Sequence, residues 1–252
     1  MIDTNVYLER YPFRRLFGDE PAELLGTLRK NKIAQAWAGS FDALLHRDLA
    51  AVNARLAEEC RRVSNGELLA MGSVNPAQPD WREDFRRCLV EHRMMGLRLH
   101  PDFHGYKLGD PPARELFAFA AERRMLLQIA CTIEDDRTQH PALRVTPINL
   151  APLAAIVRDT PELRIQLLNA RSVKPDLVRE LAATGRVYMD FAMIEGVHGP
   201  ARLSKDIGSE RIVFGSYFPF YYFEAAALKV KESALDAAVL TANAKRLLGE
   251  RR

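Results

Sequence analysis

The stretch Gly96-Leu97-Arg98-Leu99-His100-Pro101 has the pattern of a short strand that ends at a proline. Two leucines alternate with an arginine and a histidine, and period-two alternation is typical of a β-strand. A helix is predicted over Ala113–Arg124, with Asp110 as its cap and Pro111-Pro112 in its first turn. The stretch and this helix together predict one strand–helix unit.

Similar units fill the rest of the chain. The eight strand-like runs are Met1–Tyr7, Ile33–Ser40, Leu68–Asn75, Gly96–His100, Met125–Cys131, Leu163–Asn169, Val187–Ala192 and Ile212–Tyr217. Successive runs begin about 30 residues apart, which is the length of a βα module. Eight modules without a linker between them predict a single α/β domain over residues 1–252, a (β/α)8 TIM barrel. A doubly wound open sheet is disfavoured, because no GxGxxG or Walker-type loop follows an early strand.

Two further helices are predicted from their apolar spacing and their starts. In Ala43–Val63, one buried stripe faces a polar side; the stripe is Leu45, Leu49, Val52 and Leu56. The other helix covers Leu177–Thr184 and begins at Lys174-Pro175-Asp176.

Composition restricts the function classes. Of 252 residues 48% are apolar, enough for a sizeable core, and 36 Lys and Arg against 33 Asp and Glu leave a net charge of +3. We therefore expect no nucleic-acid groove. No apolar run reaches the roughly 18 residues of a membrane span, and no basic and apolar leader follows Met1-Ile2-Asp3, so we expect neither membrane insertion nor secretion. Three scattered cysteines favour a reducing cytoplasm over secretion.

In a (β/α)8 barrel the chemistry takes place at the carboxyl ends of the strands. His100 shares a strand face with Arg98, which suits a general acid or base beside an anion clamp. The alternative is a buried histidine bonded to backbone. Asp190 ends the seventh run and is either a catalytic base or a structural carboxylate that accepts from loop amides.

Other polar residues are weaker candidates. His100, Asp102 and His104 could form a metal site, but a Pro-Asp turn with an exposed histidine explains this segment as well. A solvated loop or capping turn is favoured for a second group, which consists of Glu134, Asp135, Asp136, Arg137 and His140. Cys131 is predicted to be a core thiol and not a nucleophile.

Two features bear on the type of ligand. Arg10, Arg14 and Arg15 interleave with aromatic residues after the first run, and guanidinium groups at a barrel mouth suit a carboxylate. Solvated arginines paired with surface acids are the alternative. Six of the seven residues in Tyr217–Phe223 are aromatic, against 8% of the chain. They could wall a pocket, fill the space of a metal, or bury an oligomer contact.

Six short motifs, in order along the chain, resemble the amidohydrolase-related family. They are Ile2-Asp3-Thr4-Asn5-Val6-Tyr7, Gly72-Ser73-Val74-Asn75-Pro76, Gly96-Leu97-Arg98-Leu99-His100-Pro101, Val187-Tyr188-Met189-Asp190, Arg211-Ile212-Val213-Phe214-Gly215-Ser216 and Asn243-Ala244-Lys245-Arg246-Leu247-Leu248. The resemblance implies a metal-dependent-hydrolase TIM barrel, in a family that includes decarboxylases and lactonases of small carboxylated substrates.

The resemblance also implies a divalent metal, and the positions that match its ligands are substituted here. The family's His-x-His matches Asn5 and Tyr7, and its later histidines match Ala130 and Asn169. Its aspartate after the eighth strand matches Tyr217. Neutral amide and phenol oxygens are weak ligands, so we expect no metal and no cofactor.

Two functional interpretations remain open. The first is a metal-independent hydrolase or lyase of a small carboxylated, aromatic or lactone-like molecule, with His100 and Asp190 in proton transfer. The predicted substrate contacts are Asn5, Tyr7, Arg98, Asn169 and Tyr217. The second is a catalytically silent relative that binds a small molecule or a protein partner at the barrel mouth. A homo-oligomer stays open in both.

Overall fold

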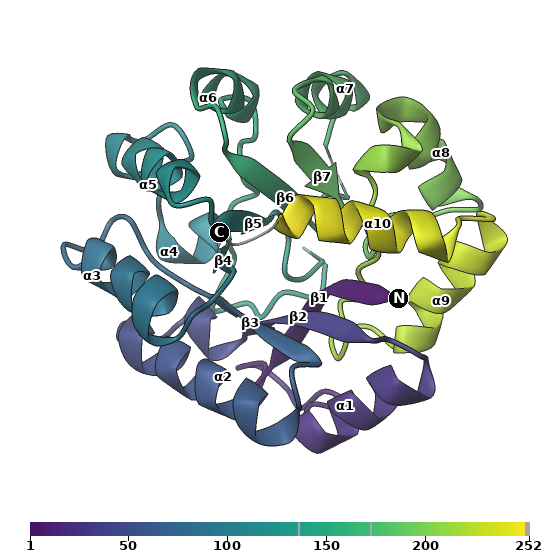
Figure 1. Ribbon diagram of the computed structural model, residues 1–252, viewed down its shortest axis with the longest axis horizontal. Helices are drawn as coiled ribbons and strands as arrows, with labels where there is room; N and C mark the ends of the chain where they lie inside the picture. Colours follow the sequence, from purple (N-terminus) through teal and green to yellow (C-terminus); the bar gives the residue numbers. More distant parts are fainter. Residues whose placement is uncertain (136, 172, 250–252) are drawn as a thin grey trace.

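A computed structural model describes residues 1–135, 137–171 and 173–249 of the chain. Seven parallel strands lie side by side in sequence order (Figure 1). They are β1 (Ile2–Leu8), β2 (Gln35–Ser40), β3 (Leu68–Gly72), β4 (Gly96–Leu99), β5 (Leu126–Ala130), β6 (Arg164–Leu168) and β7 (Val187–Met189). Each strand begins within two residues of its predicted start, so the predicted βα spacing is confirmed.

The eighth predicted strand, Ile212–Tyr217, is not a regular strand, although it closes the barrel. One isolated bridge joins Ile212 to Met189 at the end of β7, and a second joins Phe218 to Val6 of β1. Tyr217 has a φ of 58°, which lies outside the β region and interrupts a continuous ladder. The fold is therefore the predicted TIM barrel, with an irregular eighth segment.

Helices surround the strands. They are α1 (Pro21–Lys30), α2 (Leu49–Val63), α3 (Trp81–Arg86), α4 (Pro101–His104), α5 (Pro111–Glu122), α6 (Leu153–Asp159), α7 (Pro175–Ala183), α8 (Gly199–Ile207), α9 (Phe223–Glu232) and α10 (Ala237–Leu248). Short turns of helix lie at Asp42–Leu44, Arg87–Glu91 and Ser209–Arg211. Among the described residues, no helix combines the length and apolar character that crossing a bilayer requires.

The predicted helix Ala43–Val63 starts too early. Helix α2 begins at Leu49, because Asp48 caps it by accepting a hydrogen bond from the Ala51 amide at 2.9 Å. Leu45 lies in the loop before the helix and is 48% exposed. Asp110 does not cap α5 with its side chain, which accepts from the Lys107 amide.

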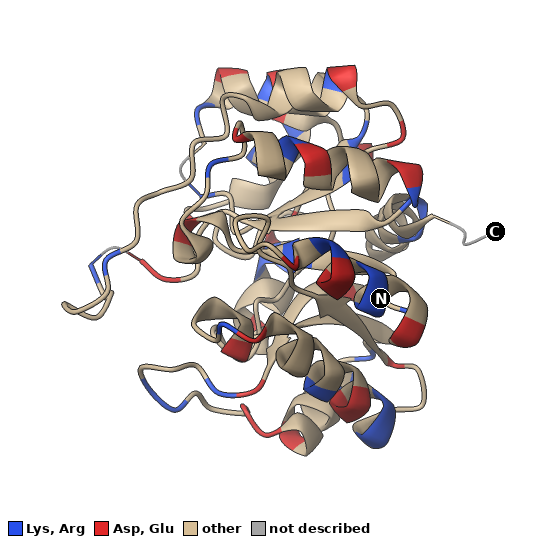
Figure 2. Ribbon diagram, turned by 90° about the vertical axis from the view of Figure 1, so that its left-hand side faces the viewer, with Lys and Arg blue, Asp and Glu red and all other residues tan. Residues whose placement is uncertain are grey.

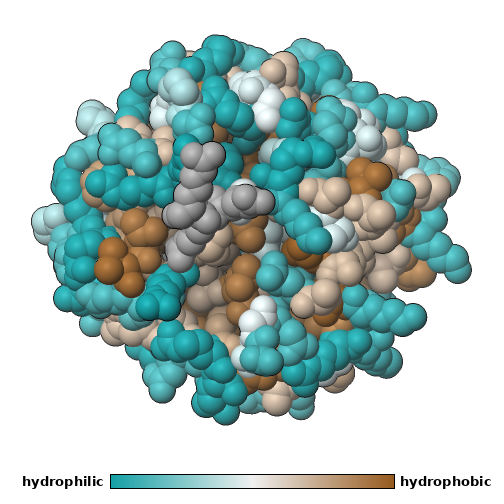
Figure 3. All heavy atoms as spheres, viewed as in Figure 1, coloured by the Kyte–Doolittle hydropathy of each residue, from teal (hydrophilic) through white to brown (hydrophobic). Residues whose placement is uncertain are grey.

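The two ends of the barrel differ. Helix α10 lies across the amino-terminal end, where Ala244 and Leu247 pack against Ile2, Trp37 and Leu126 (Figure 1). In Figure 3 this face is mostly hydrophilic, with apolar groups in the middle, toward α9 and in a patch on the side of α3. Long loops project on the opposite side, away from the chain ends (Figure 2). The carboxyl ends of the strands therefore lie under these loops.

Candidate ligand site

Asn5, Asn169 and Asp190 form a hydrogen-bonded cluster at the carboxyl end of the barrel. The Asn5 amide nitrogen donates to Asn169 Oδ1 at 3.0 Å and to Asp190 Oδ2 at 2.8 Å. The other Asp190 oxygen accepts from the backbone N–H groups of Asn169 (3.2 Å) and Ala192 (3.1 Å). All three side chains are fully buried. A Cβ at Gly215 would lie 2.8 Å from that of Asp190, so this glycine permits the close approach of the eighth segment.

Two carboxyl groups of this region bind protons more tightly than usual. Burial raises the pKa of Asp190 to about 6, although hydrogen bonds from Asn169, Ala192 and Asn5 oppose the shift. Burial raises the pKa of Asp3 to about 7, although Asp3 Oδ1 accepts from the Asn5 and Ser216 amides. Asp3 Oδ2 and Asn5 Oδ1 are buried without a hydrogen-bond partner among the described residues. This region can therefore exchange a proton near neutral pH.

Arg98 crosses the barrel interior and is bonded within the protein. Its guanidinium donates to Gln128 Oε1 (2.9 Å) and to the carbonyls of Val6 (2.7 Å), Trp37 (3.0 Å) and Thr4 (3.3 Å). The side chain is fully buried, and its guanidinium carbon lies 4.4 Å from the Tyr7 ring centroid. A carboxylate ligand could reach the Arg98 guanidinium only by displacing the Tyr7 ring that covers it.

His100 contacts Tyr7, which belongs to a cluster of four aromatic rings that we call the aromatic cover: Tyr7, Phe41, Tyr217 and Phe220. Tyr7 stacks on Phe41 at 4.5 Å and meets Tyr217 edge-on at 5.7 Å, and Tyr217 stacks on Phe220 at 4.9 Å between centroids. His100 is 1% exposed, with Nε2 3.1 Å from the Tyr7 hydroxyl and Nδ1 3.4 Å from Ser73 Oγ. Its partners are side chains and not backbone groups.

Burial also sets the charge state of these groups. It lowers the pKa of His100 well below its usual range, so the imidazole is neutral. It raises the pKa of Tyr7 to about 12 and that of Tyr217 well above its usual value. Tyr217 therefore keeps its proton and donates it to the Ile133 carbonyl at 2.6 Å.

Glu134 joins two loops over the aromatic cover, and the predicted solvated loop is wrong for this residue. It is 4% exposed, accepts from the Tyr11 hydroxyl at 2.7 Å and pairs with Arg14. The Arg14 guanidinium also lies over the rings of Tyr11 and Phe220. The loop between β1 and α1 is thereby fastened to the loop between β5 and α6.

The other residues of these loops form local pairs. Asp135 pairs with Arg137 and Arg171, and these arginines lower its pKa. His140 stacks on Phe13, and Asp136 lies outside the described residues. Arg10 and Arg15 both pair with the exposed Glu20, as the surface-pair alternative predicts, and Arg15 also pairs with the buried Asp19. Cys131 is buried and its pKa is raised by burial, as predicted for a core thiol.

The residues at the expected metal position do not fit a divalent ion. Their donor atoms are amide and phenol groups, and the Asn5 nitrogen already bonds both Asn169 and Asp190. Among the described residues, no group of three His, Cys, Asp or Glu side chains is placed to hold a metal. His100 and His104 have ring centroids 5.7 Å apart. Both ring nitrogens of His100 and Nε2 of His104 have protein partners, which leaves only His104 Nδ1 without one among the described residues.

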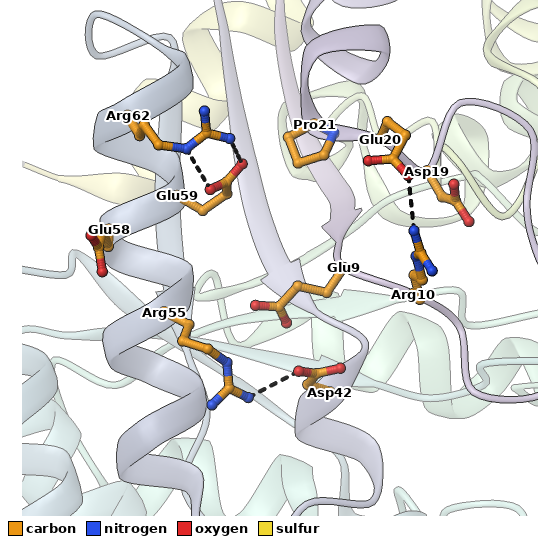
Figure 4. Close-up of a pocket in the computed structure, with 10 residues that line it drawn as sticks. All are labelled: Glu9, Arg10, Asp19, Glu20, Pro21, Asp42, Arg55, Glu58, Glu59 and Arg62. Atoms are coloured by element: carbon orange, nitrogen blue, oxygen red, sulfur yellow. Dashed lines mark hydrogen bonds and ion pairs between the residues drawn. The ribbon is translucent and has the colours of Figure 1, made fainter.

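Two cavities lie near the carboxyl ends of the strands. One, of about 530 Å³, opens between α1 and α2 and is lined by six acids and three arginines (Figure 4). Arg10, Arg55 and Arg62 are paired with acids there, so the cavity does not favour an anion. The other, of about 300 Å³, lies between α7 and α8 and reaches Asp190.

The second cavity contains residues that the sequence did not single out. Its apolar wall includes Val173, Val178, Met189, Ile194 and Leu203. Arg171, Arg202 and Asp206 are its charged residues besides Asp190. Arg202 stands on a helix and not at a strand end, so alternation along the strands gave no signal for it.

Comparison with known proteins identifies the family. The sequence profile of the amidohydrolase family, described as "Amidohydrolase", matches residues 9–249. The chain belongs to this amidohydrolase family. No curated protein matches the chain.

Solved structures resemble this amidohydrolase-family chain over its whole length. A TIM-barrel protein from Bordetella bronchiseptica has a TM-score of 0.76 at 13% identity, with 98% of both chains covered. 2,6-Dihydroxybenzoate decarboxylase from Rhizobium has a TM-score of 0.69 at 15% identity, again covering 98% of both chains. A hydrolase assigned to 2-pyrone-4,6-dicarboxylic acid, from Acinetobacter baumannii, has a TM-score of 0.67 at 11% identity over 99% of both. At these identities the likeness concerns the fold.

Proposed function

We propose that this amidohydrolase-family protein binds a small carboxylated molecule without a tightly bound divalent metal. The observation that carries the proposal is the cavity of about 300 Å³ whose inner end reaches Asp190. Apolar walls with a few polar groups are typical of small-molecule sites. The planar guanidinium fork of arginine suits a carboxylate, and two arginines lie in this lining.

The bonding of the two arginines favours Arg202 as the carboxylate anchor. Arg171 pairs with Asp135. Among the described residues, the hydrogen bond of Arg202 goes to the Val197 carbonyl through Nη1, and Arg202 has no acidic partner. Asp206 of the same lining accepts from Arg179 at 3.3 Å, which reduces its repulsion of an anion.

The structural relatives support the ligand class. The Rhizobium decarboxylase is also known in complex with 2,6-dihydroxybenzoate, and the Acinetobacter hydrolase has citric acid bound. Both ligands carry carboxylates. The five positions that match the family's metal ligands carry neither imidazole nor carboxylate, which supports the metal-free part of the proposal; they are Asn5, Tyr7, Ala130, Asn169 and Tyr217.

Titration calorimetry with benzoate and citrate tests the proposal. We expect binding of at least one of these acids to the wild type, and about tenfold weaker binding to Arg202→Lys, because an ammonium lacks the fork. Arg158→Lys is the matched control, since Arg158 pairs with Glu180 outside the cavity lining. Equal affinities for all three proteins would remove Arg202 from the site. Elemental analysis that finds one zinc or manganese per chain would overturn the metal-free part.

A second candidate function is a metal-independent hydrolase or lyase that uses the same ligand. Asp190 favours it, because this residue lies in the cavity lining and the pKa of its carboxyl group is raised to about 6. His100 is the second predicted proton-transfer residue. It and the predicted contacts Asn5, Tyr7, Arg98, Asn169 and Tyr217 are buried, so this function requires the aromatic cover to move.

Two variants test turnover once a substrate is found by screening small carboxylated compounds. Loss of a general acid or base costs about 10²–10⁴ in rate, so we expect Asp190→Asn and His100→Asn to lose turnover by that order. Wild-type rates in both variants would show that Asp190 and His100 do not act as the general acid and base. If the wild type binds these compounds but converts none of them, the protein would be a catalytically silent member of the family that only binds its ligand.

A further inference from the structure

A third cavity, of about 630 Å³, lies at the amino-terminal end of the barrel, where β3 and β4 begin beside the end of α2. The ladder between β3 and β4 starts at Met71 and Gly96, whereas Leu68 and Ala70 pair only with β2 among the described residues. The first residues of β3 therefore leave a gap toward β4, and the cavity occupies this gap. Its volume is typical of small-molecule sites. It is separate from the cavity that reaches Asp190 at the other end of the barrel.

The lining of this third cavity carries positive charge without acidic partners. Arg61 stands at the end of α2, and His92 and Arg93 lie in the loop before β4. Among the described residues, none of these three side chains forms an ion pair. The acid of the lining, Glu91, pairs with Arg86 at 2.5 Å. The two arginines are therefore available to an anion from outside the chain.

Two helix ends beside the cavity reduce its positive charge without cancelling it. Helix α2 ends at Val63, and the helical turn Arg87–Glu91 ends next to His92. Each carboxyl end of a helix acts as about half a negative charge, so the two ends offset about one positive charge. Arg61 and Arg93 carry one positive charge each. The cavity therefore retains a positive charge of about one.

His92 adds a hydrogen-bond donor to this charged rim. It is partly buried, and burial lowers its pKa; the charge of Glu91 opposes this shift, and those of Arg61 and Arg87 add to it. The imidazole is therefore neutral at pH 7 and carries one N–H group. Because the charge of Arg61 acts on His92, the guanidinium lies within electrostatic reach of the ring. One anionic group can approach both.

The inner wall of the cavity is apolar. Leu68 and Met94 are buried in this lining, and Met95 is partly buried. Ser64 fixes the turn at the rim, because its hydroxyl donates to the Cys60 carbonyl at 2.8 Å and accepts from the Leu68 amide at 3.0 Å. An apolar wall below a positive rim fits an anionic group attached to an apolar or aromatic body.

We infer that this cavity binds a phosphate monoester with an apolar or aromatic body. A phosphate monoester carries close to two negative charges at pH 7 and three acceptor oxygens, so Arg61, His92 and Arg93 can each donate to it. A carboxylate has two oxygens in one plane, and a single guanidinium fork satisfies both. The cavity lies at the opposite end of the barrel from Asp190, so the ester is an effector and not a substrate. The inference goes beyond the proposed function and does not depend on it.

Titration calorimetry with adenosine monophosphate and phenyl phosphate tests the phosphate site. Adenosine and phenol lack the phosphate, and inorganic phosphate lacks the organic body. We expect the wild type to bind at least one ester about tenfold more tightly than its phosphate-free counterpart and than inorganic phosphate. Arg61→Gln and Arg93→Gln should each weaken binding of that ester about tenfold. Arg47→Gln is the matched control and should keep the wild-type affinity. Arg47 is exposed, precedes the other end of α2 and, among the described residues, has no acidic partner.

Several results would overturn the inference. They are no binding of either ester by the wild type, equal affinities in all three glutamine variants, and loss of ester binding in Arg202→Lys, which would place the ester in the cavity beside Asp190. Inorganic phosphate that binds as tightly as the ester would show that the organic body is not recognised. Arg61 and Arg93 are exposed, so we expect both variants to fold. Their affinity for benzoate should equal that of the wild type, so the phosphate site and the proposed carboxylate site can fail separately.

Discussion

At the scale of a single residue, Arg98 shows how backbone carbonyls can stabilise a buried positive charge. The pairing of β1 with β2 shifts register between Asp3 and Val6, and the Thr4 carbonyl in that interval accepts from Arg98 and Gln128. Gly39 makes room for the side chain, since a Cβ there would lie 2.7 Å from Arg98 Cδ. The hydrogen bonds of Arg98 therefore take the place of the β1–β2 backbone hydrogen bonds that are missing at this register shift.

Because these bonds depend on the guanidinium shape, Arg98→Lys should destabilise the protein although it keeps the charge. We expect the free energy of unfolding to fall by about 3 kcal/mol, since several buried carbonyls lose their donor. Urea denaturation measures this. The exposed Arg158→Lys should change the value by no more than about 0.5 kcal/mol. Similar values for the two variants would show that Arg98 has no such structural role.

The buried acids predict the pH dependence of stability. Folding raises the pKa of Asp3 and Asp102 to about 7 and that of Asp190 to about 6 from 3.8. Their stabilising effect is complete below pH 3.8 and is lost as pH rises toward 7, because the folded state binds more protons in that interval. Asp3→Asn should make this decline shallower between pH 5 and 7, by up to about 1.4 kcal/mol per pH unit. An unchanged slope in urea melts at pH 5, 6 and 7 would contradict the raised pKa of Asp3.

At the scale of elements, the irregular eighth segment connects the barrel to its loops. Tyr217 has a positive φ, and its hydroxyl donates to Ile133 at the start of the loop between β5 and α6. We expect Tyr217→Phe to lower the free energy of unfolding by about 1 kcal/mol and to speed amide exchange within residues 131–150. Tyr222→Phe, at an exposed position, should do neither. Unaltered exchange in Tyr217→Phe would show that this hydroxyl does not hold the loop.

The elements also show how far the sequence could predict the structure. Seven strands could be predicted because the alternation of apolar and polar residues and the spacing of the apolar runs are local properties of the sequence. The irregular eighth segment depends on the backbone conformation at Tyr217, which apolar patterning does not encode. The burial of Glu134 and His100 depends on how two loops far apart in sequence pack together. Likewise, no sequence pattern indicates which backbone carbonyls bind Arg98. Arg202 could not be predicted from strand alternation, because it lines its cavity from a helix.

The molecule as a whole is a barrel closed at both ends, by α10 on one side and by the aromatic cover on the other. Leu247 of α10 is 1% exposed against the strand starts, whereas Leu228 of α9 is 63% exposed. Leu247→Ala should therefore lower the free energy of unfolding by about 2–5 kcal/mol, and Leu228→Ala by less than about 0.5 kcal/mol. Equal effects in thermal or urea melts would mean that α10 does not close the barrel.

The start of β1 and the end of α10 lie on the face opposite the long loops (Figure 2). A tag, a fluorescent protein or a sensor surface attached through either position would therefore point away from the cavity that reaches Asp190. Immobilised protein would present its loops to the flowing solution in a single orientation. The geometry suits label-free screening of compound libraries, in which attachment usually competes with access to the site.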